Sequence, residues 1–185
     1  RDPLWSRGLG DVYKRQPLIM GILNMTPDSF YDGGKFNSND SSLKRLENMV
    51  EEGASIIDIG GCSTRPGSDS ISLEDEWDRI KFIIKESVNR YPSKLISVDT
   101  YRSEIASRAL SEGVHLINDV SGGSYDSNMY KVISENNVPY VLMHLRGTPK
   151  DMMSKTNYDD LIIDIMSYFR KKIDKLKSLG INDII

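Results

Sequence analysis

The sequence contains a single cysteine, Cys62, so no disulfide can form within the chain. It also lacks any apolar run near the roughly 20 residues that a membrane-spanning helix needs. Its formal net charge of -3, without a block of Lys or Arg, gives no electrostatic reason to expect nucleic acid. These absences exclude a disulfide scaffold and a transmembrane helix, and they predict a cytoplasmic chain. A hydrophobic content of 38% over 185 residues is ordinary for one globular domain.

Residues 1–16 differ from the rest of the chain. They show neither helical nor strand periodicity, and they contain no apolar segment of the kind found in a signal peptide. Their composition resembles translated adapter or vector sequence, and a frayed native terminus is the alternative. Both interpretations predict a non-native or disordered leader over 1–16 and one domain over 17–185.

From Pro17 onward, short β-rich runs alternate with longer segments that carry apolar residues at helical spacing. Strands are predicted at 18–23, 55–60, 95–99, 114–118 and 138–143, with a sixth beginning at 181–185. A helix is predicted after each of the first five strands. Asp40 or Ser41 can cap the first helix, Ser72 lies at the start of the second, and Thr100 can cap the third. The fifth has the longest apolar stripe, from Leu161 to Leu176.

Strict alternation of strands and helices fits either a doubly wound sheet or a (β/α)8 TIM barrel. Each of the first five strands ends in polar residues. In a barrel these ends converge on one face, whereas in an open sheet only strands near the switch point share a site. The pattern therefore favours a barrel. Since a whole barrel needs about 250 residues, we expect an α/β barrel truncated after about strand six, with exposed edges and marginal stability.

Two loops carry groups suited to anions or metals. The stretch 21–34 turns from an apolar run into a polar loop at Asn24, whose carbonyl can bind Mg²⁺, a cation that takes oxygen ligands and shares phosphate oxygens. Capping of the strand end is the alternative for Asn24. In the second loop, Thr64 and Arg65 can hold a carboxylate or phosphate, although the dipeptide Pro66-Gly67 also marks an ordinary turn.

Asp99 and Asn118 form the most informative pair, because each ends an apolar strand where an unused polar group is expensive. A carboxylate and a carboxamide together complement the edge of an amino-pyrimidinone. Capping of the following helix is the alternative for both. We expect Asp119 to serve a loop or cap, His144 to be packed, and His115 to lie at the stability face. Cys62 has no activating group nearby in sequence, which argues against a nucleophile.

Taken together, these loops resemble the dihydropteroate synthase family, which belongs to folate synthesis and is the target of sulfonamides. The resemblance spans about 17–185. It lies in MGILNMTPDSF (20–30), DGG (32–34), DIGG (58–61), STRPG (63–67), SVDT (97–100), IND (117–119), SG (121–122), MH (143–144) and RGTP (146–149).

The resemblance implies a transferase that condenses a dihydropterin carrying a CH₂-pyrophosphate with p-aminobenzoate, giving dihydropteroate and pyrophosphate. It implies that Asn24 binds Mg²⁺ and that Phe30 and Asp32 act in catalysis. The substrates would be bound by Thr64, Arg65, Pro66, Asp99, Asn118 and Met143. The partners implied are these small molecules, with no nucleic acid or membrane, and a homodimer is compatible with the full-length protein.

The family's later motifs, namely an Asp after strand six, a Lys after strand seven and an Arg-His pair after strand eight, are not found in these 185 residues. We therefore expect the chain by itself to be inactive. One alternative function is a pterin-dependent methyltransferase, which would bind a methylated folate. Another is a non-catalytic pterin-binding homologue, because fold alone does not fix function.

Overall fold

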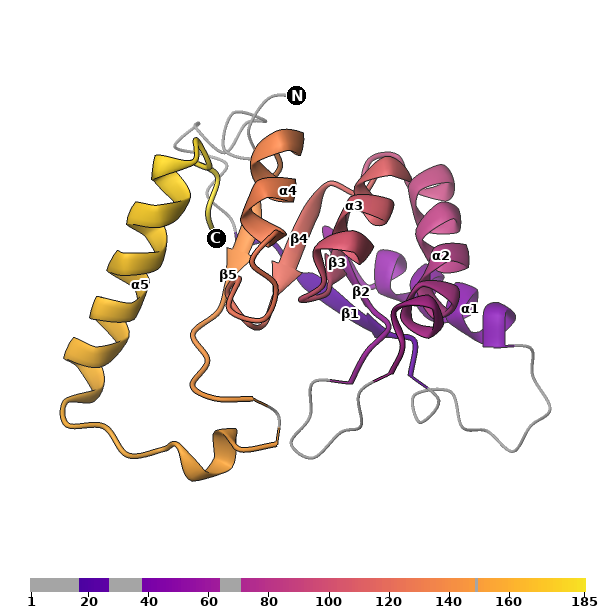
Figure 1. The fold of residues 1–185 in the computed structure, drawn as a ribbon. Coiled ribbons are helices and arrows are strands. Elements are labelled where there is room, and N and C mark those ends of the chain that lie inside the picture. The colour runs from indigo at the N-terminus through magenta and orange to yellow at the C-terminus, as the bar shows by residue number, and fades with distance from the viewer. Residues whose placement is uncertain (1–16, 27–37, 64–70, 149) are drawn as a thin grey trace.

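The computed structural model describes residues 17–26, 38–63, 71–148 and 150–185. Five parallel strands form one sheet in the order β1-β2-β3-β4-β5. They are β1 (Met20–Asn24), β2 (Ile56–Gly60), β3 (Leu95–Asp99), β4 (Leu116–Asp119) and β5 (Tyr140–Leu142). The helices are α1 (Ser38–Glu51), α2 (Leu73–Arg90), α3 (Ser103–Ser111), α4 (Met129–Asn136) and α5 (Leu161–Ser178), with a short 3-10 turn at Met152–Ser154 (Figure 1).

The strand order decides between the two predicted architectures. Each strand pairs with the next one along the chain, and the order nowhere reverses. A doubly wound sheet reverses its order at a switch point, whereas a barrel does not. The prediction of successive units of a (β/α)8 barrel is confirmed.

The predicted sixth strand is also present as a short pairing at 183–185. The amide of Tyr140 donates to the carbonyl of Asp183 at 2.9 Å, and the amide of Leu142 donates to that of Ile185 at 2.9 Å. Tyr140 and Ile184 form a parallel bridge. The chain therefore begins a further strand beside β5, continuing the same order.

The core lies between the sheet and the helices. Alternate residues of the strands point to one face of the sheet, where they meet the apolar stripes of the helices. Fully buried members from the strands are Leu23, Ile59, Val98 and Ile117, and from the helices Leu46, Ile80, Ile105 and Ile133. The opposite face carries the other residues of each strand, among them Asp58, Ser97, Asp99 and Asn118. This is the barrel's interior face.

Two capping predictions were wrong. Helix α1 begins at Ser38, so Asp40 and Ser41 lie inside its first turn rather than at its cap. The N-cap of α3 is Arg102, without a side-chain cap. Thr100 lies two residues before it, where its hydroxyl donates to Glu76 and accepts from the amide of Arg102 at 3.2 Å. The start of α2 was predicted correctly, since Ser72 accepts a hydrogen bond from the amide of Asp75 at 3.0 Å.

Two strands are shorter or shifted relative to the prediction. Strand β4 starts at Leu116 because the amide of Val114 still bonds to the carbonyl of Ala109, which extends the end of α3. Strand β5 covers only Tyr140–Leu142 of the predicted 138–143. Apolar residues that flank a strand cannot be told from the strand itself by composition.

Helix α5 forms as predicted, but most of its apolar stripe is not buried. Leu176 is its one buried residue, while Ile162 and Met166 are 64% and 66% exposed. Figure 1 shows α5 standing away from the sheet over most of its length. The expectation of exposed apolar surface is confirmed for this helix. Within the described ranges, neither α5 nor any other helix is long and apolar enough to cross a membrane.

Candidate functional site

The polar ends of the strands lie in one row across the sheet. The register pairs Asn24 with Gly60, Gly60 with Asp99, and Asp99 with Asn118. In-register residues of parallel strands project to the same face. The sequence placed Asn24, Asp99 and Asn118 at separate strand ends, and the sheet brings them together at the carboxyl end of the barrel.

Gly60 leaves space between two of these side chains. A Cβ atom at this position would lie 3.0 Å from Asn24 Oδ1 and 3.6 Å from Asp99 Oδ2. In this row, the Asn24 carboxamide lies on one side of Gly60 and the Asp99 carboxylate lies on the other. The absence of a side chain at Gly60 allows these two groups to lie close to the backbone of β2.

Asp58 lies one layer deeper on the same face, in register with Ser97. It is 3% exposed, and its Oδ2 accepts a hydrogen bond from Asn118 Nδ2 at 2.9 Å. Burial raises the pKa of Asp58, and the nearby Ser97 hydroxyl and Asn118 amide oppose this rise. The Ser97 hydroxyl is close enough to influence the carboxylate but does not reach hydrogen-bonding geometry with it.

Three buried polar atoms in this layer lack a hydrogen-bond partner among the described residues. They are Asp58 Oδ1, Ser97 Oγ and Asp99 Oδ1. An unsatisfied buried polar group costs about 1–3 kcal/mol, so three in one place indicate a site that a ligand or ordered water completes.

The electrostatics of the site centre on Asp99. Its pKa is raised to about 7, first by burial and then by the negative charges of Asp58, Asp119 and Glu76. Perturbed carboxylates of this kind concentrate at functional sites. Near neutral pH, Asp99 is thus able both to donate and to accept a hydrogen bond.

The alternative of helix capping does not apply to Asp99 or Asn118. The N-caps of α3 and α4 are Arg102 and Asn128, and neither makes a side-chain capping bond. Asp119 faces the opposite side of the sheet, where it accepts from the amides of Ser121 and Gly123 and from the hydroxyl of Tyr140 at 2.8 Å. The predicted loop role of Asp119 is therefore confirmed.

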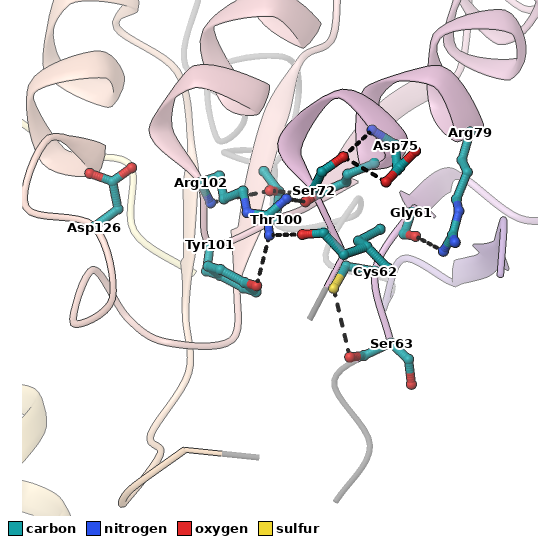
Figure 2. A network of polar contacts seen from close by, with 12 residues as sticks. Gly61, Cys62, Ser63, Ser72, Asp75, Arg79, Thr100, Tyr101, Arg102 and Asp126 are labelled. Carbon is teal, nitrogen blue, oxygen red and sulfur yellow. Dashed lines mark hydrogen bonds and ion pairs between the residues drawn. The ribbon is translucent and has the colours of Figure 1, made fainter. Parts of the chain in front are cut away.

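Two arginines of one polar network bind backbone carbonyls on either side of the range 64–70 in the sequence. Arg79 donates to the carbonyl of Gly61 at 3.1 Å on one side of that segment, and Arg102 donates to the carbonyl of Ile71 on the other. Figure 2 shows Arg79 reaching Gly61, and Arg102 beside Tyr101 and Thr100.

The network is centred on a buried carboxylate, Glu76, which is 1% exposed. It accepts from the Thr100 hydroxyl at 2.7 Å and from the Arg102 guanidinium at 2.8 Å. Burial raises the pKa of Glu76, while Thr100 and Arg102 lower it. In the sequence, Glu76 is one of three acidic residues in the first turn of α2, a pattern that suits the positive end of the helix dipole. An acidic residue in the first turn gives no sign that it turns inward.

The cysteine and the histidines behave as expected. Cys62 is 9% exposed, and burial followed by the charge of Glu76 raises the pKa of its thiol, the opposite of what a nucleophile requires. His144 packs against the rings of Tyr158, Tyr168 and Phe169. The Nδ1 atom of His115 accepts from the amide of Ile96 at 3.1 Å. These predictions are confirmed.

The remaining predicted site residues divide into two groups. Met143 is 38% exposed and follows Val141, the residue paired with Asn118, by two positions. It thus lies just after the end of β5, two positions beyond the residue that is in register with the row. The other group lies outside the described residues: Phe30, Asp32, Thr64, Arg65 and Pro66.

Asp58 and Ser97 were missed as site residues. The signal was present, because each is a polar residue in the middle of an otherwise apolar strand and two positions before a residue of the row. Residues two apart in a strand share a face. This spacing predicts a polar layer beneath the row.

Asn24 is the described residue that could bind a divalent cation at this site. No cluster of three or more His, Cys, Asp or Glu residues suited to a metal exists within the described ranges. Mg²⁺, however, usually keeps several waters and takes few protein ligands beside substrate phosphates. The Asn24 carbonyl oxygen, exposed at the end of β1 and near Asp99, is a donor of the right chemistry for such a site.

The ordered barrel units and this polar row define the class of protein. The model of the family described as "Pterin binding enzyme" matches residues 20–185, and the chain belongs to that family. The chain is 46% identical over 185 residues to the mitochondrial folate synthesis bifunctional protein of Arabidopsis thaliana, covering 97% of this chain and 32% of that protein.

Two solved structures give the same assignment. A dihydropteroate synthase from Clostridium difficile, determined in the presence of pteroic acid, has a TM-score of 0.82 and 39% identity, covering 92% of this chain and 63% of that chain. A dihydropteroate synthase from Xanthomonas albilineans with 4-aminobenzoic acid has a TM-score of 0.84 and 32% identity, with coverages of 92% and 60%. The chain spans about a third of the Arabidopsis relative and under two thirds of these structures.

Proposed function

We propose that this chain provides the pterin-binding part of a dihydropteroate synthase. The reaction joins a dihydropterin that carries a CH₂-pyrophosphate to p-aminobenzoate, and it releases pyrophosphate. The observation that carries the proposal is the pair of Asp99 and Asn118, adjacent in register at the carboxyl end of the sheet above the buried Asp58. The relatives solved with pteroic acid and with 4-aminobenzoic acid support the same substrate classes.

The bond changes require little acid or base chemistry. The C–O bond to pyrophosphate breaks with its electron pair, and the neutral amine of p-aminobenzoate then attacks the methylene carbon and loses a proton. In this scheme Asp99 and Asn118 hold the pterin ring. A negative carboxylate environment around Asp99 stabilises the positive charge that develops on the ring as pyrophosphate leaves.

Other residues extend the proposal beyond the ring. Asn24 would hold Mg²⁺, which when bound neutralises the charge of the departing pyrophosphate. Met143 would pack against the pterin, and Thr64, Arg65 and Pro66 would bind p-aminobenzoate. Phe30 and Asp32 would close the site against water, with Asp32 facing the developing cation. The homodimer of the full-length protein and the cytoplasmic location stay predictions.

A chimeric protein tests the proposal. Residues 17–185 would be joined to the remaining C-terminal part of the Clostridium difficile enzyme, and dihydropteroate formation would be measured. We expect turnover that requires p-aminobenzoate, whereas the 185-residue chain alone gives none. Asn118→Ala in the chimera should lower kcat/KM by about 100-fold, because a paired donor and acceptor are both lost.

Two outcomes would contradict the proposed function, and a third would contradict the expected inactivity of the chain by itself. A folded chimera that binds pteroic acid but forms no product would favour the non-catalytic homologue. Binding of methylated folate without binding of p-aminobenzoate would favour the methyltransferase. Turnover by the 185-residue chain alone would refute its expected inactivity. Circular dichroism of the chimera and its Asn118→Ala variant serves as the folding control.

A further inference from the structure

The Asn118 carboxamide is held by one contact that crosses the sheet. Its Nδ2 donates to Asp58 Oδ2 at 2.9 Å, although the two residues lie on β4 and β2 with β3 between them. Within the described part of the chain this is the one hydrogen bond of that side chain. Asp58 is 3% exposed, so solvent does not compete for the contact.

The contact allows one orientation of the amide. An ionised carboxylate only accepts hydrogen bonds, so it faces the NH₂ group of Asn118 and repels the carbonyl oxygen. Turning the amide by half a revolution would bring two oxygens together in a buried place. Asp58 therefore distinguishes between two orientations that are equal in shape.

The orientation determines which groups a ligand meets. One amide proton is used by Asp58, which leaves the second proton and the Oδ1 atom as an adjacent donor and acceptor. The 2-amino group of a pterin is a donor next to N1, an acceptor. In lumazine, the 2-oxo analogue, the acceptor and donor at these two positions are exchanged.

We propose that Asp58 is a positioning residue that fixes the Asn118 carboxamide so that the site selects a 2-amino pterin over its 2-oxo analogue. The inference rests on the proposed function, because it assumes that Asn118 meets the pterin ring. It assigns the choice between amino and oxo groups to a residue that lies one layer beneath Asp99 and Asn118 and acts through the Asn118 amide.

A purely structural role explains Asp58 poorly. Its second oxygen, Oδ1, lacks a partner among the described residues, and so does the adjacent Ser97 hydroxyl. Replacing buried charged groups by apolar residues of similar size is often neutral or stabilising. A carboxylate at this position therefore brings no evident gain in stability, and its contact with Asn118 is the feature that needs it.

The test compares pterin and lumazine binding to the 185-residue chain by ligand fluorescence. The wild-type chain should bind pterin about tenfold or more tightly than lumazine. In Asp58→Leu, which removes the anchor, the amide turns freely and this ratio should fall at least about fivefold. Asp58→Asn keeps the size of the side chain but can present either an oxygen or an NH₂ group, so it no longer excludes the turned amide and should lower the ratio as well. A general loss of structure would weaken both ligands equally and leave the ratio unchanged.

A double-mutant cycle shows whether Asp58 acts through Asn118. In the Asn118→Ala background, Asp58→Leu should leave the pterin-to-lumazine ratio unchanged, since no amide remains to be oriented. The amide can also be followed without ligand by NMR of its side-chain protons. They should be protected from exchange in the wild-type chain and lose that protection in Asp58→Leu, and wild-type amide protons that exchange freely would overturn the inference.

The outcomes separate the two proposals. Pterin binding with a ratio that does not change in Asp58→Leu would overturn this inference alone. Failure of the folded wild-type chain to bind pterin would overturn the proposed function and this inference with it. A changed ratio that persists in the Asn118→Ala background would show that Asp58 acts on the ligand by another route, contrary to the inference.

Discussion

Asn24 and Asp99 approach each other across the bare Cα of Gly60. Both side-chain oxygens lie within contact distance of the position that a Cβ of Gly60 would occupy, at 3.0 Å and 3.6 Å. The site thus depends on the absence of a side chain at the end of β2. Because Gly60 has no side chain, Asn24, which we propose binds Mg²⁺, lies next to Asp99, which we propose binds the pterin.

Gly60→Ala should disturb binding more than folding. The added methyl would push the Asn24 carboxamide by a few tenths of an ångström, a small change for a side chain at a strand end. We expect weaker Mg²⁺-dependent binding of pyrophosphate, measured by calorimetry, and a thermal midpoint close to that of the wild-type chain. In the Asn24→Ala background the same substitution should have little effect on that binding. An equal loss in both backgrounds would contradict this explanation.

Asp99 should make the stability of the chain depend on pH. Its pKa is about 7 in the folded chain against an ordinary value of 3.8, so the folded state holds the proton more tightly. The unfolding free energy from this group is therefore greatest at pH values below about 4 and falls as pH rises through about 7. The full shift corresponds to at most about 4 kcal/mol.

Asp99→Asn removes this titration and should be more stable than the wild-type chain at pH 8, with the difference shrinking toward pH 5. Urea unfolding at the two pH values measures it. Parallel pH dependences of the two proteins would show that Asp99 keeps an ordinary pKa.

Arg102→Ala should be strongly destabilising. It removes the charge partner of Glu76, which is 1% exposed and cannot be rehydrated. Breaking a buried ion pair in this way costs about 3–5 kcal/mol. The control is Arg108→Ala, because Arg108 pairs with Glu74, whose side chain is 67% exposed. The loss of stability in Arg108→Ala should be much smaller, and urea unfolding of both variants measures the contrast. Equal losses in the two variants would contradict a special role for the buried pair.

Helix α5 should promote self-association. Leu161, Ile162, Ile163 and Met166 are each at least half exposed on adjacent turns, and such patches favour contacts between molecules. The double substitution Ile162→Lys and Met166→Glu should therefore shift sedimentation toward the monomer without lowering the thermal midpoint. Leu176→Lys is the contrasting variant, since Leu176 is fully buried and its replacement should unfold the chain. Unchanged sedimentation would exclude this face.

The kinds and order of the elements followed from local patterns. The strand Leu95–Asp99 and the beginning of α2 after Ser72 were predicted correctly, because side-chain periodicity and capping residues act within a few positions. Asp99 and Asn118 were identified for a similar reason: each is polar where an apolar strand ends. These features need no knowledge of the rest of the chain.

Partners that are distant in sequence were not predictable in this way. Asp58 and Asn118 are sixty positions apart, and only the strand order places them on one face. Glu76 belongs to a run of three acidic residues at a helix start, yet it alone is buried, because Thr100 and Arg102 come from another βα unit.

The sequence by itself therefore determined the barrel units, the polar strand ends and the family, since periodicity and ordered motifs are local properties. The tertiary structure decided which polar groups meet. It set Asn24 and Asp99 on either side of Gly60, oriented Asn118 through Asp58, and left much of the α5 stripe exposed. Those outcomes depend on register and on the close approach of distant segments, which a one-dimensional pattern does not contain.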